Sequence, residues 1–156
     1  MRRLNIRKNL AEALAGALAT GLLSKESPLV VVGEASGLGA HLSCTIRAAV
    51  ADGRILFLGR STDGELRWLY AHCAVMLFLS LDEGFGLPPL EARAFGARVV
   101  ASDIPVLREI LPPDSAFVDP RETSAIAAAI IRSWRAGRHT CLAPVPMSPA
   151  PDWTSA

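Results

Sequence analysis

The sequence predicts an α/β fold in which a parallel β-sheet carries helices on both faces. Short apolar or β-branched runs alternate along the chain with segments of helical periodicity. This alternation is typical of parallel strands that are joined by helical crossovers. The clearest strand is the apolar run 74–81, which is followed by a loop with Gly84 and Gly86 and then by Pro88 and Pro89. The order there is strand, glycine-rich loop and helix, because proline suits the first turn of a helix.

Five strands and six helices are expected along the 156 residues, which suffice for one domain with its own core. The predicted strands are 28–33, 54–59, 75–79, 98–101 and 116–118. The predicted helices are 10–23, 40–51, 62–70, 88–95, 105–111 and 123–135. Prolines crowd the chain from Gly137 onward, so we expect a domain over 1–136 and a Pro-rich, disordered tail over 137–156.

The first helix is expected because Leu10, Leu14, Leu18 and Leu22 fall on one helical face. The strand at 28–33 is a β-branched run that a glycine ends. Farther along, Ser61 or Thr62 caps the helix whose first turn holds Glu65. The last helix is rich in alanine and isoleucine and follows Asp119 and Pro120.

The first 25 residues resemble a secretory signal peptide, since a basic start precedes the apolar stretch 10–23. Lys8 and Glu12 interrupt that pattern, and the helical periodicity favours a helix within the domain. No apolar run reaches the ~18 residues that a transmembrane helix needs.

Composition excludes several functional classes. The formal net charge is +1, so charge gives no indication of nucleic-acid binding. Cys44, Cys73 and Cys141 are scattered and read as reduced thiols of a cytoplasmic protein. His41 with Cys44, and His72 beside Cys73, lack the repeated spacing of a metal site, so no metal is expected.

The loop between the apolar run and the prolines is the candidate site. Glu83 stands at the carboxyl end of the predicted strand and Glu91 about one turn inside the following helix. Gly84 and Gly86 are expected to take positive φ and to let a ligand approach bare N–H groups. Amides at a helix N-terminus favour phosphate or an electron-rich sugar oxygen. In open α/β sheets, ligands bind at this edge.

The run Glu83-Gly-Phe-Gly-Leu-Pro-Pro-Leu-Glu91 resembles the E-x7-E motif of retaining GT-B glycosyltransferases of the family 4 type. Further segments match that family in order and spacing: Arg7-Lys8-Asn9-Leu10, Leu56-Phe57-Leu58-Gly59, Glu65-Leu66 with Leu69-Tyr70, Ala101-Ser102-Asp103 and Phe117-Val118-Asp119-Pro120. The resemblance spans residues 3 to 134.

The resemblance implies the C-terminal, Rossmann-like half of a GT-B enzyme. In that family a strand with a glycine turn precedes the position of Arg3, and an N-terminal domain binds the acceptor. We expect the edge of the strand at 29–32 to lack that neighbouring strand. The chain by itself is therefore expected to self-associate and to transfer no sugar.

By resemblance, Glu83 accepts hydrogen bonds from sugar hydroxyls and stabilises positive charge at the anomeric carbon. Lys8 and Arg3 hold the donor diphosphate, and Glu91 holds the ribose. The other donor-binding candidates are Gly84, Phe85, Gly86 and Leu87 in the loop and Arg60 with Ser61 after an earlier strand. The side chain of Phe85 has an alternative interpretation as a plug of the core.

The implied function is retaining transfer of a hexose, such as mannose or glucose, from a nucleotide-diphosphate sugar, without metal or cofactor. Expected partners are the donor and either a separate acceptor-binding domain or a second copy. The expected location is the cytoplasm, with membrane contact open at its inner face. One alternative is a non-catalytic nucleotide-sugar module that completes a site in trans. Another, a nicotinamide-binding protein, lacks the full G-x-G-x-x-G around Gly37 and Gly39.

Overall fold

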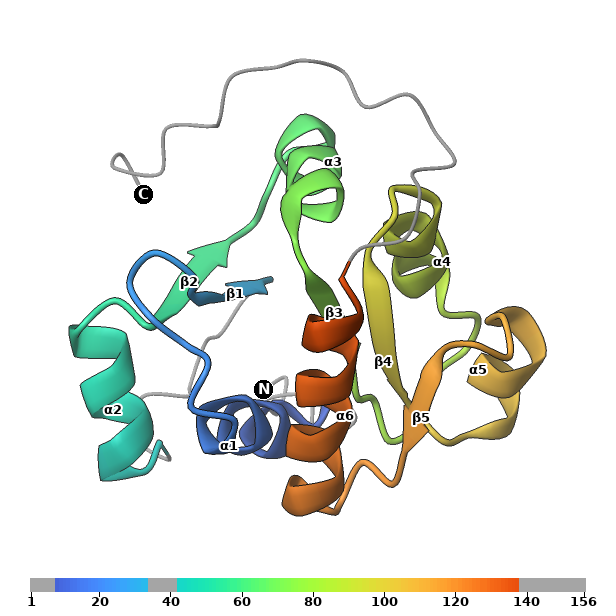
Figure 1. The fold of residues 1–156 in the computed structure, drawn as a ribbon. Helices are drawn as coiled ribbons and strands as arrows, with labels where there is room; N and C mark the ends of the chain where they lie inside the picture. The colour runs from blue at the N-terminus through green and yellow to red at the C-terminus, as the bar shows by residue number, and fades with distance from the viewer. Residues whose placement is uncertain (1–7, 34–41, 138–156) are drawn as a thin grey trace, which may run out of the picture.

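A computed structural model describes residues 8–33 and 42–137 and shows an α/β architecture (Figure 1). Helices and strands alternate as the sequence predicts. In chain order the elements are α1 (Leu10–Ala19), β1 (Leu29–Val32), α2 (Cys44–Ala51), β2 (Ile55–Gly59), α3 (Asp63–His72), β3 (Val75–Phe78), α4 (Leu87–Ala94), β4 (Arg98–Ser102), α5 (Pro105–Ile110), β5 (Ala116–Val118) and α6 (Thr123–Ala136). The predictions for Arg3, for the loop at 37–39 and for the tail beyond Gly137 lie outside the described residues.

The strands are parallel, but they form two sheets instead of the single predicted one. β1 pairs with β2, Leu29 lying opposite Ile55. β4 pairs with β3 on one side and with β5 on the other. Among the described residues no ladder joins β1 to β3, so each of these two strands has one unpaired edge. The expectation that the strand at 29–32 lacks a neighbouring strand stays a prediction.

The three-stranded sheet has helices on both faces. Because side chains alternate along a strand, Val100 of β4 points to one face, while Val99 and Ala101 point to the other. The first face packs against α1 and α6, through residues such as Ala17 and Ile126. The second face is covered by α5 and α4, and α4 in turn packs against α3.

The two-stranded sheet rests on α1 and α2. Ile55 of β2 is fully buried in a cluster with Leu14, Ile46 and Ala49, and Leu29 of β1 packs against the same cluster. Leu29 also contacts the cluster beneath the three-stranded sheet. Helix α1 therefore joins the two sheets, since Leu14 serves one core and Ala17 the other.

Local signals account for most of the element ends. Thr62 forms the predicted capping box with Glu65, whose side chain accepts from the Thr62 N–H. The first helix is shorter than predicted and ends at Ala19 instead of residue 23. Gly21 has a φ of 69° and its N–H donates to the carbonyl of Leu18, which terminates the helix. None of the helices in the described ranges is both long and apolar enough to cross a membrane.

Gly16 allows α1 to lie close to α6. A Cβ at this position would lie 2.9 Å from Cβ of Ile126 and would overlap its Cγ2. Ile126 is fully buried, so it has little room to move. The absence of a side chain at Gly16 thus sets the separation of the two helices.

We expect Gly16→Ala to lower the free energy of unfolding by about 1–3 kcal/mol through overpacking, although alanine is the better helix former. Gly64→Ala is the matched control on α3, because its added Cβ would meet only the Thr62 hydroxyl at 4.0 Å. That variant is expected to be neutral or stabilised by up to about 1 kcal/mol. Urea unfolding measures both values, and a stabilised Gly16→Ala protein would contradict the close approach.

The unpaired edges of β1 and β3 predict that the chain gains stability from an added strand. We expect a β-branched strand with a glycine turn, fused before Arg3, to raise the melting temperature. Each kcal/mol gained corresponds to about 2–4 °C for a chain of this size. A Gly/Ser extension of equal length is the control. Equal melting temperatures for the two fusions would show that the edges accept no strand.

Candidate functional site

The candidate site is the loop that leads from β3 into α4. Gly86 is the N-cap of α4 and has a φ of 78°, where glycine is strongly preferred. A Cβ there would lie 2.8 Å from Leu107 and 2.9 Å from Ile110, both on α5. Gly84 does not take the expected positive φ, and a Cβ there would meet open space. One left-handed residue is enough to turn the chain into the helix.

The loop offers backbone N–H groups to a ligand. Pro88 and Pro89 lie in the first turn of α4, as predicted, and have no N–H. The amides of Phe85, Gly86 and Leu87 donate to no other residue in the described ranges. Because the positive end of the helix dipole lies here, these amides provide a favourable environment for an anion.

Glu83 and Lys8 lie together beside this loop. Lys8 Nζ is 3.6 Å from Glu83 Oε2, and it also lies 5.5 Å from the centre of the Phe78 ring. The N–H of Gly84 donates to the other carboxylate oxygen at 3.2 Å. The lysine side chain is 56% exposed and the glutamate side chain 20% exposed. The structure thus brings a cation and a carboxylate from distant parts of the sequence to one edge of the sheet.

Asn9 holds the segment that carries Lys8. It lies in the left-handed region, with φ 52° and ψ 39°, which asparagine tolerates better than most residues. Its side-chain amide donates to the carbonyl of Pro120 at 2.5 Å, across 111 residues of sequence. One turn into α1, Glu12 accepts from the Thr123 hydroxyl at the start of α6. These two bonds fix the start of α1 against the start of α6.

Glu91 lies on the exposed side of α4, next to Ala92, against which Tyr70 of α3 packs. The Tyr70 side chain itself is buried, at 6% exposure. Burial raises the pKa of Tyr70 to about 12, and the neighbouring Glu91 carboxylate adds to the shift. At neutral pH the phenol is therefore protonated.

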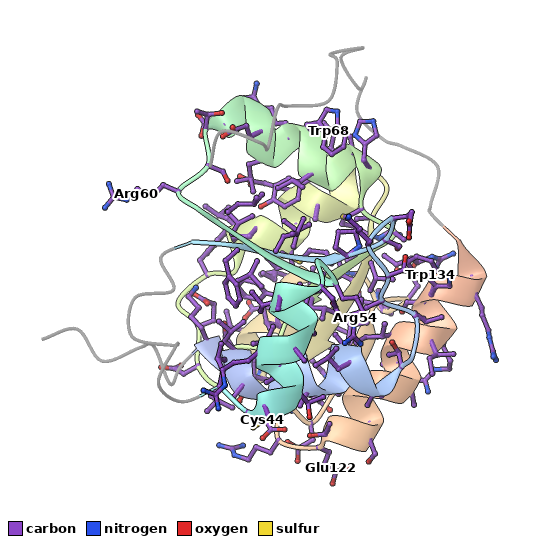
Figure 2. The ribbon with its side chains drawn as sticks, turned by 90° about the vertical axis from the view of Figure 1, so that its left-hand side faces the viewer. Cys44, Arg54, Arg60, Trp68, Glu122 and Trp134 are labelled. Carbon is purple, nitrogen blue, oxygen red and sulfur yellow. The ribbon has the colours of Figure 1, made fainter. Side chains whose placement is uncertain are left out.

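The other predicted site residues are distributed more widely. Phe85 is 59% exposed and Leu87 54% exposed, so the alternative of Phe85 as a core plug is wrong. Arg60 and Ser61 follow β2, in the other sheet from the Glu83 loop. Figure 2 shows the Arg60 side chain extending away from the body of the molecule. Arg3 lies outside the described residues.

An exposed ion pair after β4 has a structural role. Asp103, just after β4, pairs with Arg108, whose guanidinium lowers the pKa of that carboxyl, and Arg108 lies over the Phe117 ring. Both side chains are exposed and their charges offset each other. The described part of the chain holds no group of three or more His, Cys, Asp or Glu that could bind a metal ion.

Sequence reasoning gave no role to Asn9 or Tyr70. Asparagine ahead of an apolar helix signals an N-cap, yet the Asn9 side chain makes no cap and bonds to Pro120 instead. For Tyr70, the available signal was that it is the only tyrosine of the chain and stands on a helix directly before the strand that leads to the site.

We expect the Tyr70 hydroxyl to make stability depend on pH above about 10. An unfolded tyrosine ionises near pH 10, whereas folded Tyr70 keeps its proton until about pH 12. Its contribution is therefore fully present below pH ~10 and is lost as the pH rises toward ~12. The difference in unfolding free energy between the wild type and Tyr70→Phe should shrink over that range, measured by urea unfolding. A difference that stays constant with pH would contradict the raised pKa.

Comparison with known proteins places this chain in a family. The model of the family described as "Glycosyl transferases group 1" matches residues 1–137. Over 106 residues, or 68% of the chain, the sequence is 34% identical to the O-antigen chain mannosyltransferase B of Escherichia coli. Over 77 residues, or 49% of the chain, it is 38% identical to the O-antigen chain mannosyltransferase RfbU of Salmonella typhimurium. These matches span 28% and 22% of the two relatives' own lengths.

Solved structures show the same fold. The C-terminal domain of a glycosyl transferase group 1 family protein (LpcC) from Francisella tularensis aligns with a TM-score of 0.70 and 27% identity, over 83% of this chain and 70% of that one. Anabaena Alr3699/HepE in complex with UDP-glucose aligns with a TM-score of 0.64 and 26% identity, over 83% of this chain and 36% of that one. The fold is that of one half of a GT-B enzyme, and the chain belongs to the glycosyl transferases group 1 family.

Proposed function

We propose that this chain forms the donor-binding part of a retaining glycosyltransferase and binds a nucleotide-diphosphate sugar at the loop between β3 and α4. The observation that carries the proposal is the pairing of Lys8 with Glu83 at 3.6 Å, beside loop amides that donate to none of the residues that the structure describes. A diphosphate needs cations and N–H donors, and a sugar needs a carboxylate that accepts from its hydroxyls. These groups stand within one short loop and the segment packed against it.

The assignment of roles follows the charge of each group. Lys8 and the amides of Phe85, Gly86 and Leu87 receive the diphosphate oxygens. Glu83 accepts from hydroxyls of the hexose and stabilises the positive charge that develops at the anomeric carbon. The acceptor oxygen bonds to that carbon on the face from which the diphosphate leaves, and the acceptor proton passes to the departing phosphate oxygen. Side-chain and amide donors replace a metal in this scheme.

The ribose of the nucleotide is assigned to Glu91. A carboxylate accepts from both ribose hydroxyls at once, and each charge-assisted bond contributes about 1.5–3 kcal/mol. Glu91 is exposed on α4, so a ligand can reach it. Arg60 and Ser61 remain candidates for contacts with the base, and Arg3 for the diphosphate.

Relatives guide the choice of sugar. Several are named mannosyltransferases, which favours mannose as the hexose transferred by the whole protein. The Anabaena structure contains UDP-glucose, which supports a nucleotide sugar as the donor class. Cys44 and Cys73 are free thiols, which fits a reducing compartment such as the cytoplasm. An acceptor-binding domain is the expected partner.

We expect Glu83→Gln and Glu91→Ala to weaken donor binding in different ways. Glu91→Ala should reduce the affinity for the bare nucleoside diphosphate and for the nucleotide sugar by about tenfold or more. Glu83→Gln should reduce only the affinity for the nucleotide sugar. Calorimetry with GDP and GDP-mannose, and with UDP and UDP-glucose, measures these affinities.

Glu109→Gln is the control, since that carboxylate is exposed on α5 and has no assigned role. It should bind as the wild type does. Equal losses for both ligands in both site variants would reject the division of roles. A wild-type chain that binds none of the four ligands would reject the proposed function itself.

A further inference from the structure

Asn9 stands between Lys8 and the first residue of α1, and its backbone conformation is unusual. Its φ is 52° and its ψ is 39°, and among the non-glycine residues that the structure describes it alone has a positive φ. An ordinary N-cap residue is extended, and its side chain accepts from an N–H of the first helical turn. Asn9 does neither, because its side chain makes no cap. Backbone of this kind persists only where other contacts hold it, and it is common at functional sites.

The contact that holds Asn9 is made with the far end of the described chain. Its side-chain amide donates to the carbonyl of Pro120 at 2.5 Å, in a partly buried bond. Pro120 is buried and lies just after β5. Because β3, β4 and β5 are parallel, β5 ends at the same edge of the sheet from which β3 leads into the Glu83 loop. The bond thus ties the residue next to Lys8 to the edge that carries Glu83.

The position of Lys8 depends on how its backbone is held. Its ammonium lies 3.6 Å from the Glu83 carboxylate and 5.5 Å from the centre of the Phe78 ring, at the end of a long and largely exposed side chain. A lysine of this kind has many rotamers, and ordering it on a ligand costs free energy. The left-handed residue that follows turns the chain between Lys8 and α1. A fixed turn therefore reduces the number of positions that the ammonium can reach.

We propose that Asn9 is a positioning residue that holds Lys8 in place to bind the donor diphosphate. This inference rests on the proposed function. Asn9 does not touch the donor; it acts through Lys8, by its left-handed turn and its bond to Pro120. The effect of its side chain on affinity must then require both phosphate on the ligand and the ammonium of Lys8, whereas a purely structural role would require neither.

The test uses Asn9→Gly, which allows the left-handed turn and removes the amide donor. Affinities of the full chain for GDP and UDP are measured by calorimetry, and those for guanosine and uridine, which carry no phosphate, by NMR titration. We expect the variant to bind the tighter diphosphate about three- to tenfold more weakly, with unchanged affinity for the corresponding nucleoside. In a Lys8→Ala background the same substitution should have no further effect. Asn9→Ala is a second, uncharged variant that also strains the turn, so its loss should be at least as large.

Thr123→Val is the matched control. It removes the other polar bond between the starts of α1 and α6, in which the Thr123 hydroxyl donates to Glu12, and the two helices lie side by side (Figure 1). This variant should have a lower melting temperature and should bind the diphosphates as the wild type does. An equal loss of diphosphate affinity in Thr123→Val would assign the effect to the packing of the two helices and overturn the role of Asn9.

The remaining outcomes separate the inference from the function beneath it. Equal losses for diphosphate and nucleoside in Asn9→Gly, or loss of the folded circular dichroism spectrum in both Asn9 variants, would show a structural role and overturn the inference alone. So would an unchanged diphosphate affinity, or losses that add fully with Lys8→Ala. A Lys8→Ala chain that binds diphosphate as the wild type does removes the diphosphate role of Lys8, and the inference with it. No binding of any nucleotide overturns the proposed function and the inference together.

Discussion

The close packing of α1 against α6 is the contact on which the rest of this structure depends. The strands form two separate sheets, so no backbone ladder holds the two halves of the described chain together. Helix α1 provides that link, because Leu14 is buried with the strands β1 and β2 while Ala17 is buried beneath the other sheet. Gly16 permits the approach, since any side chain there would overlap Ile126. Hydrophobic burial along one short helix thus joins the two sheets, as strand pairing would in an unbroken sheet.

The same packing builds the candidate site. Lys8 precedes α1, and its position opposite Glu83 follows from how the start of that helix is held. Asn9 bonds to Pro120 and Glu12 to Thr123, so two polar contacts fix this end against the start of α6. A cation that is remote in sequence therefore reaches the loop after β3. The distance between Lys8 and Glu83 is a property of helix packing as much as of the loop itself.

The two glutamates of the loop and helix are held in different ways. Glu83 lies between the ammonium of Lys8 and the N–H of Gly84. Glu91 projects from an exposed face of α4, next to Ala92, which packs against the buried ring of Tyr70. The first carboxylate is thus paired with a cation from a distant segment, whereas the second faces solvent. Gly86 packs closely against α5 and sets the turn between Glu83 and Glu91.

The sequence by itself determined the order of the elements, most of their bounds and the loop that carries the site. Those features depend on local signals: the short buried run of the strand Arg98–Ser102, the capping box at Thr62, and the left-handed turn at Gly86. The tertiary structure alone decided the early end of α1, the absence of a positive φ at Gly84 and the division of the strands into two sheets. It also decided that Lys8 meets Glu83 and that Tyr70 packs against Ala92 of α4. These pairings join residues on different elements, and their geometry is set by which apolar faces pack together, a property that no short stretch of sequence contains.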